Sequence, residues 1–128
     1  MRPPARPWRQ RLGARSRRQG RAAEWLAAGW LLFKGYQILG FRLKAAGAEI
    51  DILARKGRVL ALVEVKRRAT PEAGLEALGP DQQQRLLSAG RSLIQSRRSL
   101  VGLDLRLDVI ALSPGHLPRH FRGLGVDG

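Results

Sequence analysis

A strongly apolar segment that ends in charged residues constrains this chain most. The five apolar residues 59–63 are followed directly by Glu64-Val65-Lys66. A run that is apolar on both faces is typical of a central strand covered on both sides. Charged groups at the end of such a strand are costly unless they are paired or bind a metal. Because residues two apart in a strand point to one side, Glu64 and Lys66 are expected to share a face.

The preceding segment, residues 49–55, repeats this pattern, with Asp51 among apolar neighbours. Lys56-Gly57-Arg58 predicts a tight reversal, so the two segments are predicted to form a hairpin. With Lys56-Gly57 at the tip, Asp51 faces Leu62 and Glu49 faces Glu64. With Gly57-Arg58 at the tip, Asp51 faces Glu64.

Either loop of even length brings Glu49, Asp51, Glu64 and Lys66 to one face, whereas an odd loop would move Asp51 away. Two carboxylates about 4 Å apart repel by about 4 kcal/mol at an effective dielectric near 20, so a shared proton, a cation or both must offset the repulsion. Mg²⁺ typically takes one or two carboxylates together with waters and phosphate oxygens. Such an ion activates water, and Lys66 could orient that water or help to deprotonate it. The pattern therefore predicts phosphodiester hydrolysis.

The rest of the chain predicts one α/β domain over residues 19–124, with a mixed central sheet of four or five strands flanked by helices. The expected helices cover about 16–34 and 80–95, and the expected strands cover 36–43, 49–55, 59–66, 104–112 and, weakly, 117–121. Residues 67–79 are expected to be a loop. Residues 1–18 hold seven Arg and no acidic residue, which predicts a disordered basic arm, either contacting phosphates or merely solvated.

Composition bounds the partners. The net charge of +14 favours polyanions such as nucleic acid or an anionic membrane surface. Only Lys34, Lys44, Lys56 and Lys66 among the 24 basic residues are lysines, so each lysine is more informative than an arginine. The absence of Cys excludes disulfides, thiolate zinc sites and Cys nucleophiles. The longest apolar run is too short for a membrane span, which leads us to expect a cytoplasmic protein.

Single residues outside the hairpin allow two interpretations each. Glu24 is the one charged residue between Arg21 and Lys34, so it either points toward a site or pairs with an Arg such as Arg21 or Arg85. For the remaining polar and aromatic positions the structural interpretation is preferred: Asp108 paired with Arg106 or a neighbouring strand, His116 and His120 at the surface, and Trp25 and Trp30 in the core rather than stacking on bases.

Several blocks of the chain, in order from Gly20 to Phe121, resemble the YraN family of uncharacterised bacterial proteins. The blocks are Gly-Arg-Ala-Ala-Glu at 20–24, Gly-Tyr-Gln-Ile-Leu at 35–39, Ala-Glu-Ile-Asp-Ile-Leu-Ala-Arg at 48–55, Val-Glu-Val-Lys-Arg-Arg at 63–68 and Leu-Asp-Val-Ile-Ala at 107–111. The resemblance implies a restriction-endonuclease-like fold, similar to archaeal Holliday-junction resolvases. The chain differs from the family pattern at Ala48, where the family has Gly, and at Gln82-Gln83-Gln84, where the family often has a Lys.

By this resemblance Asp51 matches the metal-binding acid, and Glu64-Val65-Lys66 matches the E-x-K element. Glu24 matches an acid carried on a helix. We therefore expect a Mg²⁺- or Mn²⁺-dependent endonuclease acting on DNA rather than RNA, branched or single-stranded. The expected catalytic residues are Asp51, Glu64, Lys66 and Glu24, and the expected metal ligands are Asp51, Glu64, the Val65 carbonyl and Glu24.

The phosphate contacts are expected at Arg67, Arg68, Arg85 and Arg91. Resolvase-type relatives act as dimers, so the resemblance also suggests a homodimer. The alternative is a nucleic-acid-binding protein that kept this fold without turnover, which the Gln run supports. A third hypothesis, a basic accessory protein of the ribosome or of RNA processing, rests on charge alone.

Overall fold

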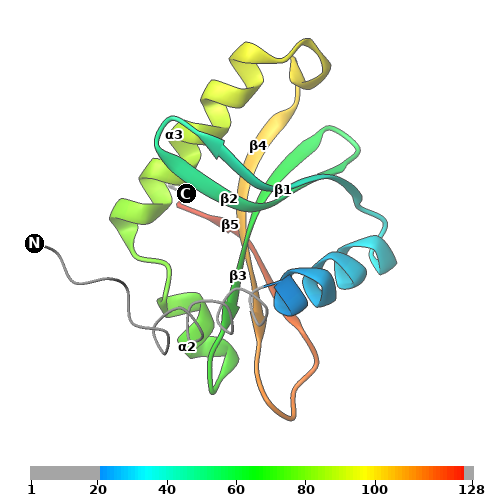
Figure 1. Cartoon of the computed structure of the whole chain (residues 1–128), viewed down its shortest axis with the longest axis vertical. Helices are drawn as coiled ribbons and strands as arrows, with labels where there is room; N and C mark the ends of the chain where they lie inside the picture. The colour runs from blue at the N-terminus through cyan, green and yellow to red at the C-terminus, as the bar shows by residue number, and fades with distance from the viewer. Residues whose placement is uncertain (1–20, 126–128) are drawn as a thin grey trace, which may run out of the picture.

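A five-stranded sheet forms the centre of the molecule, with its strands in chain order across it (Figure 1). A computed structural model describes residues 21–125 of the chain. The strands are β1 (Gln37–Ala45), β2 (Ala48–Lys56), β3 (Val59–Arg67), β4 (Asp104–Leu112) and β5 (Arg119–Leu124). The segment expected to be central is β3, which lies between β2 and β4. The basic arm expected over residues 1–18 lies outside the described residues.

The β2–β3 hairpin has the second of the two registers that the sequence allowed. Lys56 pairs with Val59, which leaves Gly57-Arg58 at the tip. Gly57 has a φ of 59°, a left-handed conformation that glycine adopts without steric cost. The antiparallel register runs from this tip to Ile52 opposite Val63. Continued by one residue, it sets Asp51 against Glu64.

Strand β4 is parallel to β3, so the chain must cross over between them. Part of this crossover is α3 (Pro80–Ser96), close to the helix expected over 80–95. The expectation of a plain loop over 67–79 was wrong, because α2 (Pro71–Glu76) lies within it. Thr70 caps this short helix by accepting a hydrogen bond from the Ala73 amide at 3.1 Å, and Pro71 suits its first turn.

Helices cover both faces of the sheet, each over its own apolar core (Figure 1). The core of one face joins α3 to β-strand residues such as Leu53, Leu62 and Leu107. The other core lies under the helix formed by residues 21–33, called here the N-terminal helix, which contributes Ala27, Ala28 and Leu31. The expected α/β architecture is confirmed: a mixed sheet flanked by helices, as in the restriction-endonuclease-like fold. No helix in residues 21–125 has the length and apolar character to cross a membrane.

Candidate metal and nucleic-acid site

The candidate site lies where β2 and β3 stop pairing. The Asp51 carboxylate accepts a hydrogen bond from the Val65 amide at 2.9 Å, and the Asp51 amide donates to Glu64 Oε1 at 3.5 Å. Ile50 packs in the core under α3, whereas Ile52 packs in the core under the N-terminal helix. Regular alternation would put both isoleucines on one face, so β2 is irregular at Asp51. This irregularity holds the carboxylate at the point where the strands separate.

Burial raises the proton affinity of both acids. Glu64 is 4% exposed. Burial, followed by the charge of Asp51, raises the pKa of Glu64 to about 8. Burial also raises the pKa of Asp51, against the Val65 hydrogen bond that lowers it. The positive charge of Lys66 lowers the pKa of each acid, so the ammonium acts electrostatically on both.

Glu24 reaches this region from the N-terminal helix but is held by another residue. Both of its carboxylate oxygens lie 3.0 Å from Arg42 Nε. Sequence reasoning considered Arg21 and Arg85 as partners and missed Arg42. Arg42 lies in β1 with a positive φ of 52°, and no sequence signal predicts such a conformation for an arginine.

Glu49 does not join the acids, so the expectation of a shared face was wrong for this residue. Its side chain is exposed, and its strand partner is Lys44 of β1. The physical reason is the irregularity at Asp51, since the pairing of β2 with β3 ends at Ile52 and Glu49 lies beyond it.

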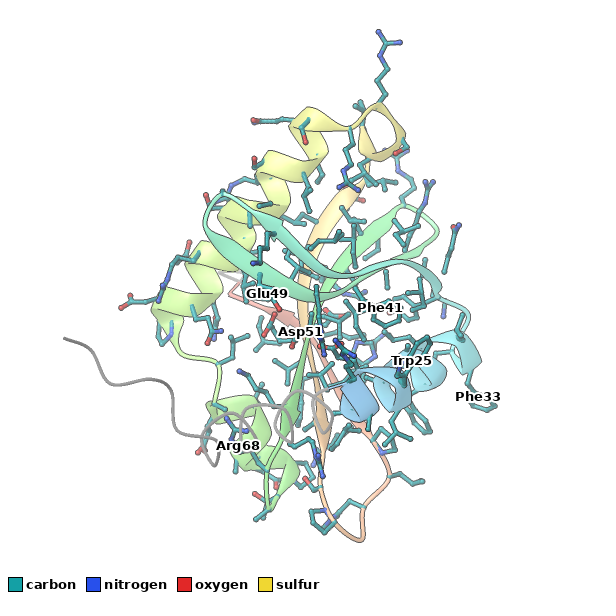
Figure 2. All side chains as sticks on the ribbon, in the orientation of Figure 1. Trp25, Phe33, Phe41, Glu49, Asp51 and Arg68 are labelled. Carbon is teal, nitrogen blue, oxygen red and sulfur yellow. The ribbon has the colours of Figure 1, made fainter. Side chains whose placement is uncertain are left out.

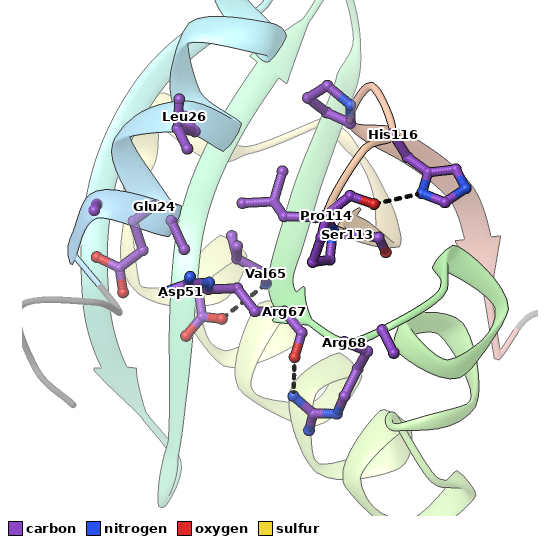
Figure 3. Close-up of a pocket in the computed structure, with 14 residues that line it drawn as sticks. Glu24, Leu26, Asp51, Val65, Arg67, Arg68, Ser113, Pro114 and His116 are labelled. Atoms are coloured by element: carbon purple, nitrogen blue, oxygen red, sulfur yellow. Dashed lines mark hydrogen bonds between the residues drawn. The ribbon is translucent and has the colours of Figure 1, made fainter.

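A cleft of about 1010 Å³ opens beside Asp51 (Figure 3). The predicted site residues that line it are Glu24, Asp51, Val65, Arg67 and Arg68. Glu64 and Lys66 do not line the cleft. Sequence reasoning missed the lining residues Ser113, Pro114, His116 and Pro118, which form the turn after β4. The Pro-Gly pair at 114–115 predicts a turn, but nothing local to it predicts what the turn reaches.

The two remaining predicted phosphate contacts, Arg85 and Arg91, are exposed on α3 and do not line the cleft. Arg67 is the last residue of β3 and Arg68 follows it, and Arg68 Nη1 donates to the Arg67 carbonyl at 2.7 Å. Two of the four predicted arginines are therefore brought to the cleft beside the acids.

A second polar cluster is centred on Asp108, which is fully buried. Arg106 donates to both carboxylate oxygens of Asp108 at 2.9 and 2.8 Å, as one interpretation of the sequence had it. His120 Nε2 lies 2.7 Å from Asp108 Oδ2. Burial alone would raise the pKa of Asp108, but the hydrogen bonds from His120 and Arg106 outweigh it and lower that pKa.

Two structural expectations for single residues were wrong. The His120 side chain is 2% exposed rather than at the surface, because β5 extends past it and turns it toward Asp108. Trp25 is 68% exposed rather than in the core. The N-terminal helix buries the stripe of Ala23, Ala27 and Leu31, and helical spacing puts residue 25 off that stripe.

The fold and the site define an α/β protein of the restriction-endonuclease-like class in which buried Glu64 contacts Asp51, and Asp51 lines a cleft together with Arg67 and Arg68. The chain belongs to the uncharacterised protein family UPF0102, whose family model matches residues 23–112. It is 52% identical over 112 residues to a UPF0102 protein of Caulobacter vibrioides, covering 88% of this chain and 90% of that protein. It is 44% identical over 118 residues to a UPF0102 protein of Maricaulis maris, covering 89% and 93%. The expected membership in an uncharacterised bacterial family is thus confirmed.

Proposed function

We propose that this protein is a metal-dependent nuclease that hydrolyses phosphodiester bonds in DNA. The observation that carries the proposal is the contact between Asp51 and Glu64, with Asp51 in the lining of a cleft that Arg67 and Arg68 also line. In a bacterium such an activity would meet its DNA in the cytoplasm. The homodimer suggested by the resemblance remains part of this proposal.

The acid pair fits a hard divalent cation such as Mg²⁺ or Mn²⁺. Burial and nearby acids raise the pKa values of Asp51 and Glu64 even with the charge of Lys66 acting on both, and a divalent ion would supply further positive charge. Asp51 and Glu64 would hold the ion, together with the Val65 carbonyl. Residues 21–125 contain no group of three or more acidic or His side chains arranged to bind a metal. Waters and phosphate oxygens would therefore fill the other positions, as Mg²⁺ prefers.

A bound divalent ion supplies a water of lowered pKa and neutralises charge on the phosphate. Lys66 lies outside the cleft lining, but its charge acts on both acids, and from beside them it would orient the attacking water and could accept or return a proton through its amine. Glu24, fixed by Arg42, orients the water or assists a second ion. Arg67 and Arg68 bind the phosphate in the cleft, while Arg85 and Arg91 contact DNA further away along α3.

The test is a cleavage assay with and without Mg²⁺ or Mn²⁺ on duplex, single-stranded, flap and four-way DNA. Wild-type protein is compared with an Asp51→Ala/Glu64→Ala double variant purified in the same way. We expect cleavage of at least one substrate that requires the metal and is lost in the double variant. Absence of metal-dependent cleavage on every substrate, or equal cleavage by the double variant, would refute the proposal.

The alternative is a DNA-binding protein on this fold without turnover. One observation favours it: Glu24, the third acid expected at the site, is engaged by Arg42. The double variant separates the two hypotheses. A binding protein keeps or gains DNA affinity when its acids are removed, because two negative charges leave the phosphate surface, and it has no cleavage to lose.

A further inference from the structure

The N-terminal helix presents large aromatic side chains to solvent. Trp25 is 68% exposed and Phe33 is 85% exposed. They lie on the helix face opposite the buried stripe that packs on the sheet. Exposed aromatic groups of this size mark a surface that binds something, because their burial against a partner is strongly favourable.

These two rings follow the helix on one side. Residues 25, 29 and 33 recur at the four-residue spacing that places side chains one above another. Gly29 stands between the rings, and a Cβ added there would meet no atom within 4 Å, so the space between the rings is open. At about 1.5 Å of rise per residue, Trp25 and Phe33 are about 12 Å apart along the axis.

Each ring packs against one other aromatic ring and is otherwise exposed to solvent. Trp25 lies 5.3 Å from the Phe41 ring, and Phe33 lies 6.1 Å from the Trp30 ring in a stacked arrangement. In Figure 2, Trp25 lies between Asp51 and Phe33, and the Phe33 side chain points away from the molecule. Glu24, the residue before Trp25, lines the cleft together with Asp51, so the two rings run from the end of the helix beside the cleft toward its far end.

Positive charge gathers at that far end. Lys34 Nζ lies 2.6 Å from His120 Nδ1. Because His120 Nε2 contacts the Asp108 carboxylate, that nitrogen carries the ring proton and Nδ1 accepts from the Lys34 ammonium. Lys56 Nζ donates to the Lys34 carbonyl at 2.7 Å.

At this end of the helix, positive charges outnumber negative ones. Arg122 and Arg106 also lie close enough for their charges to act on Lys34, and Asp108 is the acid that opposes them. Burial together with these cations lowers the pKa of Lys34. Two of the four lysines of this arginine-rich chain are placed here, where a compact ammonium suits a phosphate oxygen.

We infer that the N-terminal helix binds an unpaired nucleic-acid strand, with bases stacked on Trp25 and Phe33 and a backbone phosphate held at Lys34 and Lys56. The strand would enter the cleft at Asp51, which rests on the proposed function. Aromatic platforms combined with cations are the usual means of binding single strands, because every base has a face to stack and every linkage carries a negative charge. A second copy of this chain is a poorer occupant, since it would bring another +14 charge against these cations.

The experiment measures binding by fluorescence anisotropy in EDTA, where metal-dependent cleavage plays no part. The probes are a labelled oligonucleotide of about 15 nucleotides and its duplex. We expect the wild-type protein to prefer the single strand, and Trp25→Ala and Phe33→Ala each to weaken its affinity by about five-fold or more. Trp25→Phe keeps a ring and should stay close to wild type. Leu32→Ala removes a 58% exposed apolar side chain from the same helix and is the matched control.

Three results would overturn the inference. The first is equal affinity of wild type for single strand and duplex. The second is a Leu32→Ala effect as large as that of Phe33→Ala, which would indicate apolar contact without stacking. The third is unchanged strand binding by both alanine variants, with loss instead of a dimer in sedimentation or of binding to anionic vesicles.

The nuclease proposal and the strand-binding inference can be refuted independently of each other. If no substrate is cleaved but the single strand binds through Trp25, the inference stands and the nuclease proposal falls. If duplex is cleaved and Trp25→Ala alters neither cleavage nor strand binding, the reverse holds. Circular dichroism melts confirm that each variant is folded before its affinity is compared.

Discussion

Asp51 and Glu64 lie side by side where β2 and β3 separate, with the Asp51 amide 3.5 Å from a Glu64 carboxylate oxygen. Two acids so placed, with Glu64 buried and Asp51 half-buried, are unfavourable in the ionised state. The pair therefore links stability to pH and to cation binding.

The pH dependence follows from the pKa of Glu64, about 8 in the folded chain against 4.5 as the ordinary value. The folded state binds a proton that the unfolded state releases, so this contribution to stability is full below about 4.5 and is lost as pH rises through about 8. We expect urea unfolding in EDTA to show wild type losing stability over that window relative to Glu64→Gln, which has no such proton. A constant difference between the two proteins across the window would contradict the raised pKa.

Lys66 is predicted to act on the attacking water rather than on metal affinity. Lys66→Met should lower single-turnover cleavage by about 100-fold or more, the range that proton-transfer groups supply. Mn²⁺ affinity should stay the same or rise slightly, because the ammonium that is removed repels the ion. The same change should raise the pKa of Glu64 further, since Lys66 lowers it. Retention of full cleavage by Lys66→Met would remove the lysine from the mechanism.

The buried Asp108 cluster is predicted to stabilise the fold. Asp108→Ala strands Arg106 and His120 without their partner and leaves the Gly123 amide unbonded. Loss of one member of a buried ion pair costs about 3–5 kcal/mol, measurable by urea denaturation. Glu72→Ala is the control, because the Glu72–Arg119 pair is exposed and should contribute less than about 1 kcal/mol. Similar losses for both variants would show that burial does not set the difference.

Two helical glycines should respond in opposite directions to alanine. A Cβ at Gly74 of α2 would lie 2.7 Å from the Ala111 Cβ of β4, and such overpacking costs about 1–3 kcal/mol. A Cβ at Gly29 meets nothing within 4 Å, so helix propensity alone should stabilise that variant by up to about 1 kcal/mol. Thermal melts of the two variants give the comparison. A stabilising Gly74→Ala would mean that α2 does not pack closely on β4.

The sheet could be predicted from the sequence because each strand carries its signal within its own residues. The apolar run before Glu64, the Gly57 reversal and the alternation over residues 104–112 each reflect one strand or one turn. A two-residue hairpin loop left two possible partners for Asp51 on the facing strand, Leu62 and Glu64. The observed pairing of Lys56 with Val59 selects the register that leads to Glu64. Thr70 and Pro71 also mark the start of α2, but six residues give too little periodicity to show it among loop signals.

The surroundings of the site could not be predicted in the same way. Arg42 holds Glu24 across 18 positions of sequence, and Asp108 draws in His120 from the neighbouring strand. Such pairs depend on which faces meet in three dimensions, and periodicity within one segment does not report that. The prediction that Glu49 shares a face with the other acids was wrong for a related reason. It assumed regular alternation of side chains through Asp51, where β2 is irregular.

The most direct test of the central claim is calorimetric titration of Mn²⁺ into wild-type protein and into an Asp51→Asn/Glu64→Gln variant at pH 8, with both folded by circular dichroism. We expect saturable binding to the wild type that is lost in the variant, because the amides keep the shape of the pair but not its charge. Saturable binding of equal affinity in both proteins, or none in the wild type, would show that these acids do not form a metal site.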